Sequence, residues 1–106
     1  MPAPDLELHP AALEDALAGY GWYLERSLRV ADAFLAELER GLQFIAADPE
    51  SWPPYLLGAR HYVLHKYPYS IVYKVAGSSV VVYAFAHAKR APGYWKSRLG
   101  WRPRTG

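Results

Sequence analysis

Residues 60–86, RHYVLHKYPYSIVYKVAGSSVVVYAFA, decide the fold of this 106-residue chain. The stretch alternates with the period of two that is typical of β-strands. The predicted strands are residues 60–66, 69–75 and 80–86. Only Tyr67-Pro68 and residues 76–79 separate them, and links this short join antiparallel neighbours. The stretch therefore predicts a three-stranded antiparallel meander.

Two helices are predicted before the meander. Residues 10 to about 27 carry apolar side chains at helical spacing, namely Leu13, Ala16, Leu17, Tyr20, Tyr23 and Leu24, and Pro10 suits a first helical position. A second helix is predicted from residue 28 to 48, with Val30, Phe34, Leu38, Leu42 and Ile45 on one stripe. It should end at Asp48, because Pro49 disfavours helical geometry in the residue before it. With almost no linker, the helices must form an antiparallel hairpin.

A first strand is predicted at residues 6–9, and the hairpin should cover one face of the sheet. In the middle strand the apolar face carries Tyr69, Ile71, Tyr73 and Val75, and the opposite face carries Ser70, Val72 and Lys74. In the last strand we expect the small residues Val80, Val82, Ala84 and Ala86 to face the helices. An exposed strip of Val81, Tyr83, Phe85 and His87 would then face outward and need a partner. The fold class is α+β, with a helical hairpin on a mainly antiparallel sheet.

Charge is divided unequally along the chain. All ten acidic residues lie at or before Glu50, so the formal charge runs from −7 over residues 1–50 to +9 over residues 51–106. A basic tail occupies about residues 88–106. Such a split indicates a polyanion or an acidic protein as partner, or else two halves of the chain that pair with each other.

The length predicts a single domain, residues 1–106. The chain has no cysteine, which excludes disulfides and thiolate metal sites. His61 and His65 share a strand face, but no neighbouring carboxylate or cysteine completes a zinc site, so we expect neither metal nor cofactor. The N-terminus does not look like a signal peptide, and no apolar run reaches the roughly 18 residues of a membrane span. We therefore expect a cytoplasmic protein without membrane association.

The most specific motifs lie from the meander to the tail. In order they are Arg60, Leu64, the run Tyr67-Pro68-Tyr69-Ser70-Ile71-Val72-Tyr73, His87, Arg90, Pro92, Tyr94, Trp95 and Arg98. Together with the first strand and the helical hairpin, their order resembles the RelE/ParE superfamily of toxins from bacterial type II toxin–antitoxin systems. The resemblance covers nearly the whole domain.

That superfamily contains ribosome-dependent messenger RNA endonucleases and ParE-like inhibitors of DNA gyrase. Cleaving RNA through its own 2′-hydroxyl requires a base, cations near the phosphate and a proton donor, for which His87, Arg90 and Tyr94 are the candidates. Members that cut RNA typically carry an arginine on the outward face of the middle strand, where this chain has Ser70. Lys74 lies about 13 Å further along that face, too far to replace it. The Tyr-Pro-Tyr and His-x-x-Arg-x-Pro-x-Tyr-Trp motifs look more like the ParE-like branch.

The resemblance therefore implies a toxin of the plasmid-stabilisation type that binds and inhibits gyrase and is not itself an enzyme. Residues expected to contact the target are His87, Arg90, Tyr94, Trp95, Lys96, Arg98, Trp101 and Arg102, with Arg104 beyond them. Two alternatives stay open. One is a RelE-like ribosome-dependent mRNA endonuclease, and the other is a non-toxic interaction module that retains the fold.

The resemblance also implies a cognate antitoxin as partner. We expect an acidic, apolar-studded antitoxin segment to cover Lys74, Val81, Tyr83, Phe85 and Lys89, because burial and charge complementarity would combine there. Operator DNA would be read by the antitoxin, so this chain needs no DNA-reading element of its own.

Overall fold

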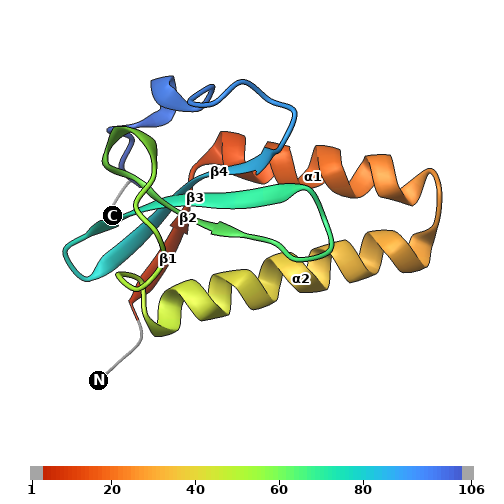
Figure 1. Cartoon of the computed structure of the whole chain (residues 1–106), viewed down its shortest axis with the longest axis horizontal. Coiled ribbons are helices and arrows are strands. Elements are labelled where there is room, and N and C mark those ends of the chain that lie inside the picture. The colour runs from red at the N-terminus through yellow and green to blue at the C-terminus, as the bar shows by residue number, and fades with distance from the viewer. Residues whose placement is uncertain (1–3, 104–106) are drawn as a thin grey trace.

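In the computed structural model, which describes residues 4–103, two helices pack against a four-stranded sheet (Figure 1). The elements are β1 (Asp5–Leu8), α1 (Pro10–Leu24), α2 (Leu28–Ala47), the short 3-10 helix η1 (Leu56–Gly58), β2 (Arg60–Val63), β3 (Tyr69–Ala76), β4 (Ser79–His87) and the 3-10 helix η2 (Lys96–Arg98). The sheet order is β1-β4-β3-β2, with β1 parallel to β4 and the meander antiparallel. The α+β prediction is confirmed, and none of the described helices is long and apolar enough to cross a bilayer.

The helix ends follow from local capping. His9 precedes α1, and its Nδ1 accepts a hydrogen bond from the Ala11 N–H at 2.9 Å, while Pro10 takes the first helical position. Ser27, expected at the end of the first helix, instead caps α2, because its Oγ accepts from the Val30 N–H at 3.3 Å. The first helix therefore ends earlier than predicted, whereas the second agrees with its prediction to one residue.

The face that α1 buries agrees with the prediction at Ala16, Tyr20 and Tyr23 but differs at the leucines. Leu13, Leu17 and Leu24 are 49%, 62% and 44% exposed, and the buried residues are Ala12, Ala16 and Gly19. The reason is close approach: a Cβ on Gly19 would lie 2.8 Å from the Tyr69 hydroxyl oxygen. Only small side chains fit at that distance, so the leucines point away from the sheet. In α2, by contrast, Phe34, Leu38 and Ile45 are buried as predicted, but Val30 is 39% exposed.

Strand β4 contains a bulge that reverses its alternation. Val72 pairs with Ala84 but Tyr73 pairs with Val82, which leaves Tyr83 as an extra residue. Val80 and Val82 face the helices as predicted. Beyond the bulge, Phe85 joins that core, while Ala84 and Ala86 join a second apolar cluster on the other face. The prediction that Phe85 faces outward and Ala84 and Ala86 inward is therefore wrong.

The outer face of the sheet is covered by the C-terminal segment, residues 93–103. Trp95 packs there with Ala59, Val72 and Ala84, and Tyr55 lies beside it at 6.1 Å between ring centroids. Figure 1 shows this blue segment next to the green loop that precedes β2. Val81, Tyr83 and Phe85 are each at most 3% exposed. The predicted exposed strip is therefore absent from the described structure.

Strand β2 ends at Val63, short of the predicted residue 66, because a buried carboxylate turns the chain. The N–H groups of His65 and Lys66 donate to Glu37 Oε2 at 3.0 and 3.2 Å. Glu37 is only 6% exposed. It satisfies two backbone donors that strand pairing leaves free and ties this turn to α2.

Candidate functional site

A nearly buried ion pair joins the C-terminal segment to the first helix. Arg98 Nη1 donates to Asp15 Oδ2 at 2.7 Å, and Nη2 donates to Oδ1 at 3.3 Å. The side chains of Arg98 and Asp15 are 14% and 10% exposed. Arg98 Nη1 also donates to the Tyr83 carbonyl at 2.9 Å, at the bulge of β4. The acidic N-terminal half and the basic C-terminal half of the chain thus pair with each other at this point, which is one of the two interpretations of the charge split.

Asp15 also accepts two further hydrogen bonds. The Tyr94 hydroxyl donates to it at 3.1 Å and the Phe85 N–H at 3.2 Å. Burial, and then the charge of Asp15, raise the pKa of Tyr94 to about 12. Burial alone would lower the pKa of Arg98, but the hydrogen bond and charge of Asp15 outweigh it and raise that pKa. The polar groups of Tyr94 and Arg98 therefore bind Asp15 within the domain. They could contact a target, as predicted, only if the C-terminal segment moved away from α1.

The two tryptophans of the segment also serve the fold. Trp95 is 1% exposed, so it cannot anchor a partner without leaving the sheet. Trp101 is partly exposed and lies 5.0 Å from the His9 ring, and its carbonyl accepts from the Tyr83 hydroxyl at 3.4 Å. Trp101 thus closes the outer face beside the start of α1 and keeps one side open to solvent.

Four cations of the two predicted partner surfaces are exposed. Arg90, Lys96 and Arg102 belong to the predicted target surface, and Lys89 belongs to the predicted antitoxin surface. Lys74, predicted for the antitoxin surface, is half-buried, and Arg104 lies outside the described residues. Among the cations of these two predicted surfaces, the exposed ones therefore lie in the loop before η2, at the first residue of η2 and beyond its end.

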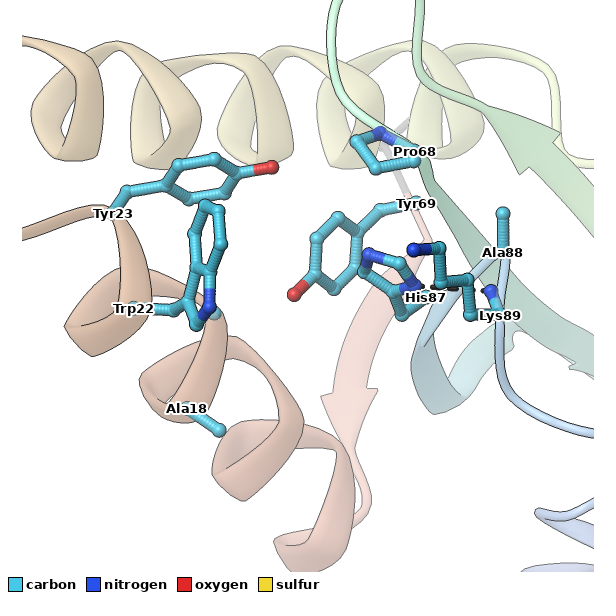
Figure 2. A pocket seen from close by; sticks show the side chains of 9 residues that line it. Ala18, Trp22, Tyr23, Pro68, Tyr69, His87, Ala88 and Lys89 are labelled. Atoms are coloured by element: carbon cyan, nitrogen blue, oxygen red, sulfur yellow. Dashed lines mark hydrogen bonds between the residues drawn. The ribbon is translucent and has the colours of Figure 1, made fainter. Parts of the chain in front are cut away.

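A cavity of about 540 Å³ opens between α1 and the ends of β3 and β4. Figure 2 shows Trp22 on one side, and Tyr69, His87 and Lys89 on the other. His87 packs edge-on against Tyr69 at 5.0 Å between centroids, and its Nδ1 accepts from the Lys89 N–H at 3.0 Å. Ala18, Tyr69 and His87 also line an adjoining hollow of about 280 Å³. We call the first space the Trp22 cavity.

The adjoining hollow brings together the three residues considered for RNA cleavage. His87, Arg90 and Tyr94 all line it, and the Arg90 guanidinium stacks 3.8 Å over the Tyr94 ring. The carboxylates of Glu14 and Asp15 line it as well. Their negative charge repels a phosphate, and Asp15 already accepts a hydrogen bond from the Tyr94 hydroxyl. The three residues therefore lie close together, but the two carboxylates beside them remove the positive charge that RNA cleavage needs around the phosphate.

The comparisons with known proteins identify the family. A family model described as the ParE toxin of the type II toxin–antitoxin system, parDE, matches residues 6–92. The chain belongs to the ParE toxin family. The solved structure of the chromosomal ParDE TA system from P. aeruginosa is similar, with a TM-score of 0.73, 15% identity, and coverage of 82% of this chain and 98% of that chain. At that identity the likeness concerns the fold. No curated protein sequence matches the chain.

ParE membership confirms the resemblance seen in the sequence, but two largely buried acids were missed. Asp15 and Glu37 received no role, although both are acids placed among small or apolar positions of an amphipathic helix. Trp95, Arg98 and Trp101 lie beyond the matched residues 6–92, in the segment that closes the outer face. In this ParE chain they hold that segment in place.

Proposed function

We propose that this ParE-family chain is a toxin that inhibits DNA gyrase by binding, without catalysing a reaction, and that a cognate antitoxin neutralises it in the cytoplasm. Family membership over residues 6–92 supports the toxin assignment. In this proposal the toxin traps a cleaved gyrase–DNA complex and thereby blocks replication.

The observation that carries the choice of gyrase over RNA is the closed outer face at Ser70. RNA-cutting members of the superfamily typically carry an arginine at the position of Ser70. Here Ser70 lines a hollow of only about 90 Å³, which Tyr55 and Trp95 also line. Because Trp95 is 1% exposed, its ring covers the outer face beside Ser70 and offers no stacking surface to a base of a messenger RNA strand.

The chemistry beside Ser70 also disfavours RNA cleavage. A proton donor for a leaving oxygen works best with a pKa near the working pH. The Tyr94 hydroxyl has its pKa raised to about 12 by burial and then by Asp15, and it already donates to that carboxylate. A binding mode of inhibition requires no such group.

The exposed cations supply the contact with the target. Lys96 and Arg102 lie within the C-terminal segment and remain exposed, whereas Arg98 between them is held by Asp15. Long cationic side chains suit the phosphates of a gyrase–DNA complex or an acidic protein surface. In this proposal the ion pair positions the segment, and its neighbours make the contact.

Controlled expression in bacteria without antitoxin tests the proposal. The wild-type chain should arrest growth, and the double variant Lys96→Glu/Arg102→Glu should restore it. The matched control Arg29→Glu/Arg40→Glu changes two exposed arginines of α2 and should remain toxic. Growth without arrest at confirmed wild-type expression would leave only a non-toxic module, and new 5′ ends in messenger RNA would favour a nuclease.

A further inference from the structure

We propose that the Trp22 cavity binds an acidic peptide segment, with an aromatic side chain seated between Trp22 and Tyr69 and a neighbouring carboxylate held by Lys89 and His87. The antitoxin is the protein that supplies this segment, so the inference rests on the proposed function. It moves the antitoxin contact away from the β4 strip that the fold buries.

The apolar side of the cavity is formed by the exposed ring of Trp22, whose orientation is fixed by its neighbours. Trp22 is 53% exposed although it is the largest side chain on α1. The Arg26 guanidinium lies 3.4 Å over its ring, and Arg26 Nη1 donates to the Trp22 carbonyl at 2.6 Å. Tyr23 meets the indole edge-on at 5.0 Å. An exposed aromatic side chain with a fixed orientation is typical of residues that dominate binding energy in interfaces.

The polar groups of the cavity are donors. Burial raises the pKa of Tyr69, so its hydroxyl keeps its proton, and within residues 4–103 that hydroxyl donates to no other group. His87 Nδ1 accepts the Lys89 N–H, so a neutral His87 ring carries its proton on Nε2. The Lys89 ammonium adds a full positive charge, and no carboxylate is among the described residues that line the cavity. A cavity that offers hydrogen-bond donors and no carboxylate among its described lining residues suits a carboxylate ligand.

The surroundings favour a peptide over a nucleic acid. Glu14 and Asp15 line the adjoining hollow, directly beyond Ala18, Tyr69 and His87. A nucleic acid entering the cavity would bring successive phosphates towards these carboxylates. A peptide can place one carboxylate at Lys89 and an uncharged backbone beside Glu14. The charge of the cavity rim therefore selects an isolated anion.

Peptide binding can be measured directly by NMR on the ¹⁵N-labelled protein. The probe is acetyl-Glu-Trp-Asp-amide, with acetyl-Gln-Trp-Asn-amide and acetyl-Glu-Ala-Asp-amide as controls for charge and for the aromatic ring. We expect the first peptide to shift the Trp22 indole N–H and the Gly19 amide, and each control to bind at least fivefold more weakly. The indoles of Trp52 and Trp95, outside the cavity, should not move.

Variants locate the site. Ala18→Trp fills the cavity from an exposed helix position and should abolish the shifts, whereas the control Leu17→Trp places the same ring on an exposed flank outside the cavity. Lys89→Glu should weaken the acidic peptide at least fivefold, and Lys66→Glu should not. Circular dichroism should show that all four variants are folded. With the cognate antitoxin, Ala18→Trp should weaken binding at least tenfold relative to Leu17→Trp.

Several results would overturn the assignment. They are equal binding of the uncharged peptide, shifts at Trp52 in place of Trp22, unchanged antitoxin affinity in Ala18→Trp, or tighter binding of oligothymidylate than of the peptide at the same residues. These outcomes are independent of gyrase. A chain that binds the peptide but leaves gyrase untouched would contradict the proposed target and keep the cavity assignment.

Discussion

Replacing Asp15 with alanine should destabilise the domain by about 3–5 kcal/mol, the usual cost of removing one partner of a buried ion pair. The estimate follows from the contacts. Arg98 is 14% exposed and would lose both of its bonds to the carboxylate. The Phe85 N–H and the Tyr94 hydroxyl would lose their acceptor as well. Partial exposure of a displaced Arg98 keeps the total within that range.

The loss can be measured by urea unfolding and by thermal unfolding, each followed by circular dichroism and tryptophan fluorescence. Domains of this size hold only about 5–15 kcal/mol, and 1 kcal/mol moves the melting temperature by roughly 4–8 °C, so a shift above about 12 °C is expected. The matched control is Glu25→Ala, which removes an exposed ion pair of 3.8 Å to Arg26 and should cost at most about 1 kcal/mol.

A double-mutant cycle identifies the cause. Because both single variants break the same interaction, Asp15→Ala/Arg98→Ala should lose clearly less stability than the sum of the two. An Asp15→Ala variant within about 1 kcal/mol of wild type, or strictly additive losses, would refute the view that this ion pair fixes the C-terminal segment.

Three further predictions concern packing and pH. Gly41→Ala should destabilise the domain by about 1–3 kcal/mol, because the new Cβ would lie 2.7 Å from the Cδ1 methyl of Ile71 in β3. Gly21→Ala should stabilise α1 by about 0.5–1 kcal/mol, because nothing lies within 4 Å of the new Cβ. Urea unfolding of the two variants compares these effects. Burial raises the pKa of Tyr73 and Tyr94 to about 12, so the folded state keeps protons that the unfolded chain loses near pH 10, and unfolding titrations should show stability falling from pH 10 to 12. Burial, and then Arg98, lower the pKa of His9 from 6.5, so its NMR titration midpoint should lie below 6.5 and stability should decrease as the pH falls through that range.

Periodicity was sufficient to predict the order of elements but not the phase of β4. The run Val80 to Ala86 is apolar at every position, so alternation cannot reveal that Tyr83 is an extra residue. A bulge depends on pairing with β3, which local sequence does not encode. In α1 the same limit applies, because leucines and small residues both recur at helical spacing. Close approach of the helix to Tyr69 selected the small ones.

The site residues were found by resemblance, but their roles depend on distant contacts. Arg98 reads as a free cation of a basic tail until Asp15, 83 positions earlier, is placed against it. Trp95 reads as a partner anchor until the outer sheet face is seen to need a cover. The Trp22 cavity combines α1 with the ends of β3 and β4, so only the assembled fold shows it.

The most direct measurement of the central claim uses purified gyrase, supercoiled plasmid and ATP. Folded, antitoxin-free protein should cause cleaved gyrase–DNA complexes to accumulate and supercoiling to fall as its concentration rises, and Lys96→Glu/Arg102→Glu should weaken both effects. Unchanged supercoiling with no cleaved complex, at concentrations that arrest growth in cells, would contradict gyrase as the target.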